Sequence, residues 1–388
     1  MIRIRQAKTL VRIFCLALAL SGLATPAAAG IIKGKPGEPD DNRQLSKYLD
    51  QQTYLSKVGY LTHRSAYLSE KPHQEYISCT ATLVAPTVIV TAASCVEDFW
   101  GLKQDLYFVP GWSANNNFPK GRYPVLKSYI PLAYKNGDRL GNDIAFMELG
   151  PTGGYDEPKT AGQMVGNMGF WGKVQFTPRF AMTIGFPLDK PFGQYFEKGC
   201  EVKLTNIGDR GLRVECDMMN GQQGSPLLFY DKQRNNYYLE GVMSEGGLDF
   251  NYGSRITPER QRLVSDIRDG KFNAESLTEK WQVYEHERSF KIGVLVRNAC
   301  DTNDLLVARH FKDTDGNWQQ DGFFKIVPNE TVEIIRSNNR YYYLNAHNAN
   351  KQFTRNDVYK TIQSSGSIGF QEYHASDFID QYQTFGCF

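Results

Sequence analysis

Histidine is the side chain that most often moves protons near neutral pH, so its positions limit the chemistry that this chain can carry out. None of its six histidines lies between Cys79 and Thr257, where the sequence is richest in strand-like segments. A base of the usual kind is therefore not expected there. A metal pair formed by His310 and His347 is an alternative, but we favour ordinary core or surface positions and predict neither a metal site nor a cofactor. The histidines are His63, His73, His286, His310, His347 and His374.

Cysteine is the second reactive side chain to place. Apart from Cys15 near the N-terminus there are six cysteines, with no CxxC motif and no histidine close to any pair, which disfavours zinc and favours disulfides. Two pairs are each 16 residues apart, and the last two cysteines bracket the C-terminal segment. This spacing predicts the disulfides Cys79–Cys95, Cys200–Cys216 and Cys300–Cys387.

The first 29 residues have the three regions of a cleaved signal peptide. A cationic start (3–12) is followed by an apolar run (13–20) and by small residues (25–29). The apolar run is too short to span a bilayer, although a retained anchor is an alternative. We expect a secreted or periplasmic protein without a membrane span. Without the leader, 40 basic and 42 acidic residues give a net charge of −2, so a nucleic-acid groove is not expected.

Short β-runs separated by Gly, Pro and Asn clusters follow from about residue 53 to 257, a pattern typical of a β-barrel or sandwich. Residues 30–52 look like an irregular lead-in. The charged stretch 258–281 has apolar residues at loosely helical spacing and predicts helices that join two units. We therefore expect a mostly β protein with domains at 30–270 and 291–388 and a helical linker at 271–290.

Three segments of the first domain, in order, resemble motifs of the chymotrypsin-fold serine proteases. They are CTATLVAPTVIVTAASC (79–95), GNDIAFMEL (141–149) and CDMMNGQQGSPL (216–227), the last similar to the nucleophile loop of bacterial glutamyl-endopeptidase-like members. GVMSEGG (241–247) and NYGSRIT (251–257) look like the family's substrate strand and closing strand. The resemblance implies a chymotrypsin-like double β-barrel over roughly residues 53–270.

The same resemblance indicates that the catalytic triad is degenerate. Ser94 stands where the family has its histidine, and Gln223 stands where it has the nucleophilic serine, whereas Asp143 matches the aspartate. A hydroxyl is too weak a base to accept a proton near pH 7, and a carboxamide is not a nucleophile. An oxyanion hole formed by Gly221 and residue 223 would keep only a small part of the catalysis.

Other residues of the motifs have less direct roles. Ser225 and Ser244 match positions that pack against or line the cleft, and we expect neither to attack a substrate. Asp217 stands where basic specificity arises in trypsin-like members, but we interpret it as part of the structural Cys-Asp pair. A triad relocated to His63 or His73 would need an unusual loop path.

The start of the mature chain weakly resembles the family's activating N-terminus, Ile-Val-Gly-Gly. The match is IIKG at residues 31–34. In that family the freed amine pairs with an aspartate beside the nucleophile, but here the neighbour is Gln222, which carries no charge. We interpret the segment as a surface tail.

Residues 291–388 resemble a family of small β-rich bacterial domains of unknown function, which implies no activity. The segments that carry this resemblance are VLVRNAC (294–300) and RYYYLNA (340–346). The leading hypothesis is a secreted pseudoprotease that binds a peptide or protein ligand, such as a protease or an inhibitor. An active serine endopeptidase with displaced catalytic residues is the alternative, and a structural or adhesive module is a third class.

Overall fold

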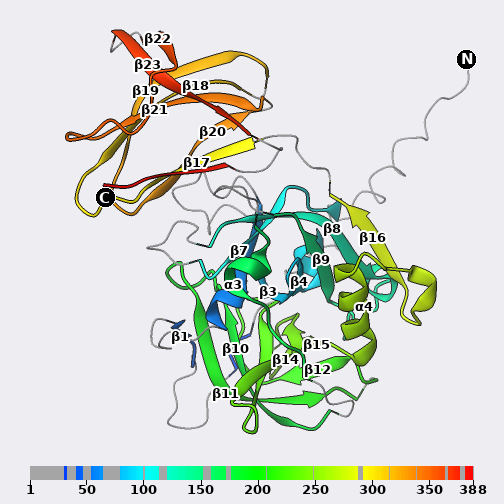
Figure 1. Ribbon diagram of the computed structural model, residues 1–388. Coiled ribbons are helices and arrows are strands. Elements are labelled where there is room, and N and C mark those ends of the chain that lie inside the picture. Colours follow the sequence, from blue (N-terminus) through cyan, green and yellow to red (C-terminus); the bar gives the residue numbers. More distant parts are fainter. Residues whose placement is uncertain are drawn as a thin grey trace, which may run out of the picture.

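Two closed antiparallel barrels form the first part of the chain, as the computed structural model shows (Figure 1). The structure describes residues 30–32, 41–46, 54–63, 79–98, 101–112, 120–151, 159–171, 176–206, 208–247, 249–286, 292–313, 315–337, 339–362, 366–375 and 381–387. The expected signal peptide at 1–29 and His73 lie outside these residues. Among them, no helix is long and apolar enough to cross a membrane.

The first barrel closes because β8 pairs with both β7 and β9. Its strand order is β8-β7-β2-β3-β4-β9, and β16 is added outside β8. The 3-10 turn Ala93–Cys95, which carries Ser94, follows β4 directly. The strands are β2 (Val58–His63), β3 (Cys79–Ala85), β4 (Val88–Thr91), β7 (Leu106–Pro110), β8 (Tyr123–Pro131), β9 (Ala145–Leu149) and β16 (Trp281–Glu285).

The second barrel has the same closed form, with β11 paired to both β10 and β12. Its order is β11-β10-β13-β14-β15-β12, and β1 is added outside β11. The Gln223 loop precedes β13. The strands are β1 (Gln44–Leu45), β10 (Arg179–Gly185), β11 (Tyr195–Leu204), β12 (Gly211–Val214), β13 (Pro226–Asp231), β14 (Asn236–Met243) and β15 (Asn251–Arg255).

The largest apolar core lies between the two barrels, where residues on the outer faces of their strands meet, among them Phe146 of β9 and Ile184 of β10. Helix α4 (Pro258–Arg268) covers this core with Leu263 and Ile267. The short helices α2 (Leu132–Lys135) and α3 (Ala161–Val165) and the hairpin β5 (Glu97–Asp98)–β6 (Gly101–Leu102) are peripheral. This architecture confirms the expected fold class, a chymotrypsin-like double barrel followed by a further β-rich part.

The expectation of a helical linker at 271–290 is wrong in its described part. That part contains only the 3-10 turn Ala274–Ser276 and then β16, which extends the first barrel. Trp281 of β16 is buried in the core between the barrels. Burial of the tryptophan and pairing with the edge of β8 stabilise a strand here, although the local sequence is charged.

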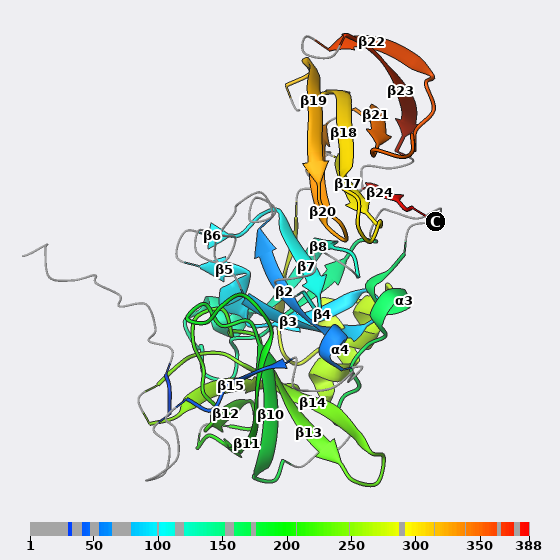
Figure 2. The same cartoon turned by 90° about the vertical axis from the view of Figure 1, so that its left-hand side faces the viewer.

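The C-terminal residues form two sheets with an apolar core between them. Figures 1 and 2 show these sheets next to the β7 and β8 end of the first barrel. One sheet has the order β20-β17-β24 and the other β19-β18-β21-β23-β22. Their strands are β17 (Ile292–Asn298), β18 (Leu305–Lys312), β19 (Trp318–Ile326), β20 (Thr331–Ser337), β21 (Tyr341–His347), β22 (Val358–Ile362), β23 (Gly366–His374) and β24 (Gln381–Phe385).

The three expected disulfides are present: Cys79–Cys95, Cys200–Cys216 and Cys300–Cys387. The first joins β3 to the turn that carries Ser94. Thr80, next to Cys79 on β3, donates its backbone N–H to the Gln223 carbonyl (2.9 Å). The strand β3 is therefore joined both to the turn that carries Ser94, through the disulfide, and to the Gln223 loop.

Candidate functional site

Ser94, Asp143 and Ser244 come together at one buried carboxylate. The backbone N–H of Ser94 donates to Oδ1 of Asp143 (2.8 Å), and the Ser94 hydroxyl donates to Oδ2 (3.1 Å). The Ser244 hydroxyl also donates to Oδ2 (2.8 Å). Both oxygens of the aspartate therefore accept hydrogen bonds from serines.

Burial raises the pKa of Asp143, whereas the hydrogen bonds from Ser94 and Ser244 lower it. The loop around it is held by Arg260 of α4, whose guanidinium is buried and donates to the carbonyl of Gly141 (2.9 Å). Arg260 is balanced by Glu279 at 2.6 Å. The carboxylate is thus well supported, but its partners are hydroxyl and amide groups that do not act as a base near neutral pH.

Of the histidines, His286 is bound elsewhere in the first barrel, because its Nε2 lies 2.6 Å from the hydroxyl of Ser128 on β8. Burial lowers the pKa of His286 to about 4. His63 lies at the end of β2, opposite Leu106 of β7. His310 and His347 are on neighbouring strands of the C-terminal sheet. The described residues contain no group of three or more His, Cys, Asp or Glu that could hold a metal ion.

Gln223 folds its own side chain back onto the loop. Its Oε1 accepts the backbone N–H of Gly221 at 2.9 Å. The carboxamide of Gln223 therefore occupies the backbone N–H of Gly221, two residues earlier in the same loop. Gly221 has φ +92°, and a Cβ there would collide with the carbonyl oxygen of Phe186, so the loop requires glycine at this point.

Ser225 is fully buried behind this loop. Its backbone N–H donates to the Gln222 carbonyl (2.9 Å), and its hydroxyl lies in the space that the missing side chain of Gly185 leaves free. A buried hydroxyl at this position packs against β10. Ser244 differs from it, because its hydroxyl donates to Asp143.

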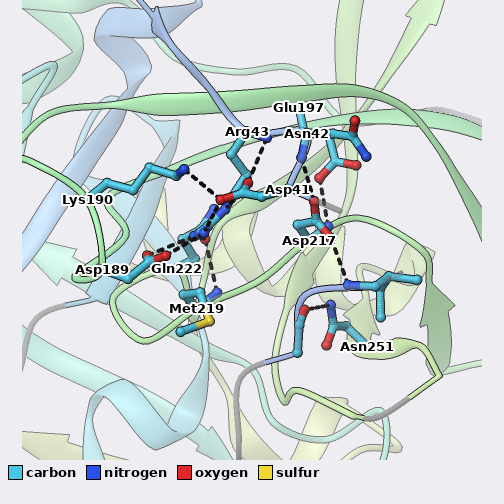
Figure 3. A network of polar contacts seen from close by, with 12 residues as sticks. Asp41, Asn42, Arg43, Asp189, Lys190, Glu197, Asp217, Met219, Gln222 and Asn251 are labelled. Carbon is cyan, nitrogen blue, oxygen red and sulfur yellow. Dashed lines mark hydrogen bonds and ion pairs between the residues drawn. The ribbon is translucent and has the colours of Figure 1, made fainter. Parts of the chain in front are cut away.

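Asp217 lies under the loop and holds the N-terminal segment (Figure 3). Its two carboxylate oxygens accept the backbone N–H groups of Ile32 (2.8 Å) and Asn42 (2.9 Å). The Gly30 carbonyl accepts the N–H of Met218 (3.1 Å). The interpretation of residues 31–34 as a surface tail is therefore wrong in its described part, residues 31 and 32, because the Ile32 N–H is bound by Asp217.

Glu197 of β11 lies beside Asp217 and accepts its backbone N–H at 2.7 Å. Burial, followed by the negative charge of Asp217, raises the pKa of Glu197 to about 8. Burial also raises the pKa of Asp217. Two adjacent buried acids thus lie under the Gln223 loop, and the raised pKa of Glu197 means that the pair resists carrying two negative charges together.

Arg43 is the functional-site residue that the sequence did not indicate. Its side chain is fully buried and donates to Oε1 of Gln222 (2.8 Å), the residue before Gln223. It also forms ion pairs with Asp41 (3.0 Å) and Asp189 (2.5 Å), as Figure 3 shows. A cation therefore does reach residue 222, but it is a side chain from inside the N-terminal segment, and its charge is balanced by aspartates rather than by residue 222.

No protein-family model matches this sequence, and no curated protein matches it either. Among solved structures the chain is similar to a glutamyl endopeptidase in complex with MPD, at 20% sequence identity and a TM-score of 0.46. The match covers 62% of this chain and 99% of the endopeptidase. It is also similar to the protease Anisep from Arthrobacter nicotinovorans (16% identity, 55% and 93% covered, TM-score 0.42). The thermostable serine protease AL20 from an extremophilic microorganism gives 17% identity, 54% and 96% coverage and a TM-score of 0.44. The similar proteins are thus trypsin-like serine proteases, and the resemblance read from the sequence agrees with the two closed barrels.

Proposed function

We propose that this chain is an exported pseudoprotease, a serine protease homologue that binds a protein or peptide and does not cleave it. The single observation that carries the proposal is the hydrogen bond from Gly221 N–H to Oε1 of Gln223 at 2.9 Å. In this proposal residue 223 stands at the position of the nucleophile and carries a carboxamide, which also accepts the Gly221 N–H that would bind the oxyanion. Acyl transfer needs both the nucleophile and the oxyanion donor.

The proposal places ligand binding in the double barrel, residues 30–270, and treats residues 291–388 as a further β-rich domain. Three disulfides fit an extracellular or periplasmic location. Two of the three triad positions are replaced, at Ser94 and Gln223, whereas Asp143 is still held by hydrogen bonds. This combination favours a protein that has lost catalysis and has kept the protease fold.

Restoring two side chains tests the catalytic part of the proposal. The variant Ser94→His with Gln223→Ser places an imidazole at a position whose N–H already donates to Asp143, and it releases the N–H of Gly221. We expect weak hydrolysis of p-nitrophenyl acetate in the double variant, at least about tenfold above either single variant, since triad members act as a unit. A folded double variant no better than the single ones would mean that the cleft lacks the geometry we assign to it.

The wild-type protein provides the opposite test. We expect no labelling by a fluorophosphonate probe and no turnover of unfolded casein. Casein turnover that Ser225→Ala or Ser244→Ala abolishes would establish the alternative, an active endopeptidase with displaced residues.

Binding at the cleft is tested with the half-exposed Gln223 itself. We expect Gln223→Arg to abolish co-purification of the partner from the native cell envelope. Gln233→Arg, the same substitution in the exposed turn between β13 and β14, should leave it unchanged. Unchanged capture by Gln223→Arg would favour the structural or adhesive class, in which the cleft is not used.

A further inference from the structure

Leu295 of β17 is fully buried, but it does not belong to the core of the C-terminal sheets. Its neighbours Val294 and Val296 do, because alternate side chains of a strand point to opposite faces. Leu295 instead joins a cluster from the barrels, which we call the aromatic cluster: Tyr60, Val109, Trp112 and Phe186, with Phe192 packed against them.

A buried ion pair makes a second connection between the same parts of the chain. Arg122, just before β8, has a fully buried side chain and lies 2.8 Å from Glu333 of β20, which is 3% exposed. Arg336 also contacts Glu333, at 3.1 Å. Because a buried charge is costly without its partner, this pair favours one fixed position of the C-terminal sheets.

The aromatic cluster leads directly to the Gln223 loop. The rings of Tyr60 and Phe186 are 5.4 Å apart, and Tyr60 pairs with Thr80 across β2 and β3. The Phe186 N–H donates to the Thr80 hydroxyl (3.1 Å), which donates to the Gly221 carbonyl (2.9 Å).

We propose that the C-terminal sheets act as a buttress that holds the Gln223 loop in position through Leu295. Leu295 fixes the aromatic cluster, Phe186 and Tyr60 fix Thr80, and Thr80 fixes both ends of the Gly221–Gln223 segment. Local opening of a loop depends on such packing and hydrogen bonds. The inference goes beyond the proposed function, because it concerns the ligand-free loop and holds whatever the cleft binds.

Hydrogen exchange of the full mature chain, measured by mass spectrometry, tests the buttress. In Leu295→Ala we expect peptides covering 186–192 and 218–226 to exchange at least about tenfold faster than in wild type, because truncating a buried leucine weakens the packing around it. Leu295→Met, which conserves volume, should restore exchange to within about threefold of wild type. The matched control is Leu344→Ala, a fully buried leucine in the core of the C-terminal sheets, which should leave both peptides unchanged.

Two results would overturn the proposal. One is unchanged exchange of 218–226 in Leu295→Ala. The other is an equal increase in Leu344→Ala, which would mean that any loss of C-terminal stability spreads to the loop. If Leu295→Ala does not fold, Leu295→Val replaces it, with an expected increase of about threefold in the exchange rate of both peptides. The same two results in that variant would overturn the proposal. Failure of the buttress leaves the proposed function standing, since the esterase and capture experiments do not involve Leu295.

Discussion

Glu197→Gln should make the protein more stable above neutral pH, although it removes an acid from the middle of a hydrogen-bonded network. Glu197 is 6% exposed and its pKa is raised to about 8. The folded chain therefore keeps a proton on this carboxyl up to about pH 8, whereas the unfolded chain loses it near the ordinary value of 4.5. The stability that goes with the bound proton is complete below about pH 4.5 and is lost as the pH rises to 8.

The size of the effect follows from the gap between the two pKa values. Between 4.5 and about 8 the gap corresponds to at most about 5 kcal/mol of unfolding free energy. Relaxation around the ionised group reduces this, and we expect about 2 to 3 kcal/mol. Glutamine keeps the oxygen that accepts the Asp217 N–H (2.7 Å) and replaces the carboxylic O–H with an amide donor. The substitution therefore removes the titration while it preserves the hydrogen bond.

Thermal unfolding followed by near-ultraviolet circular dichroism from pH 4.5 to 8.5 measures the difference. We expect the Tm of Glu197→Gln to match wild type at pH 4.5 and to exceed it by roughly 5 °C or more at pH 8. The control is Glu201→Gln on the same strand, a 29% exposed side chain paired with Lys203, for which we expect no such gain. A Glu197→Gln variant less stable than wild type at pH 8 would refute the reasoning, because Glu197 would then be needed in its charged form.

Two further substitutions test the residues that hold the Gln223 loop. Arg43→Met should cost roughly 3 kcal/mol at pH 7 in urea unfolding, against no measurable cost for Arg234→Met in an exposed ion pair. Burial raises the pKa of Asp41, but hydrogen bonds from Arg43 and Lys190 lower it by more, so the folded chain keeps this carboxylate charged at lower pH than the unfolded chain does. The loss of unfolding free energy in Arg43→Met should therefore shrink as the pH falls below about 4. A loss that stays constant down to pH 2 would contradict this assignment. Gly224→Ala should destabilise by at least about 2 kcal/mol more than Gly137→Ala. Both glycines have positive φ, but only at Gly224 would a Cβ collide with the Thr80 carbonyl and the Thr91 hydroxyl. An equal loss of unfolding free energy in the two variants would mean that the positive φ alone, and not the collision, determines the destabilisation.

The parts of the molecule that the sequence predicted depend on contiguous signals. Cysteine spacing predicted the disulfides, and the alternation of short apolar runs with turn residues predicted the β fold. The motifs around Ser94 and Asp143 placed each residue directly beside a strand of the expected barrel. Their approach to 2.8 Å therefore needed only that the barrel form. Local sequence determines such features because each motif contains both the strand and the residue that the strand positions.

The prediction of a helix failed in the described part of the linker, 271–286, because the structure there depends on distant residues. Trp281 and Val283 are compatible with either a helix or a strand, and charged neighbours favoured an exposed helix. The edge of β8, some 150 residues earlier in the chain, offers unpaired backbone groups that select the strand. Glu279 is charged yet buried, because Arg260 neutralises it, and no pattern in the sequence indicates that pair.

The network around Arg43 could not be predicted for a related reason, and it changes how the loop is held. The sequence argument asked whether residue 222 offers a negative charge to an incoming ammonium group, and Gln222 does not. In the structure a cation does lie beside residue 222, but it is the side chain of Arg43 and not a terminal ammonium group. Asp41 and Asp189 balance its charge, and Gln222 contributes only the oxygen of its carboxamide. A guanidinium within the chain is present as soon as the protein folds, whereas a new terminal amine requires a cut at one particular bond. Residue 222 is therefore held by a contact that does not depend on which residue becomes the first of the mature chain.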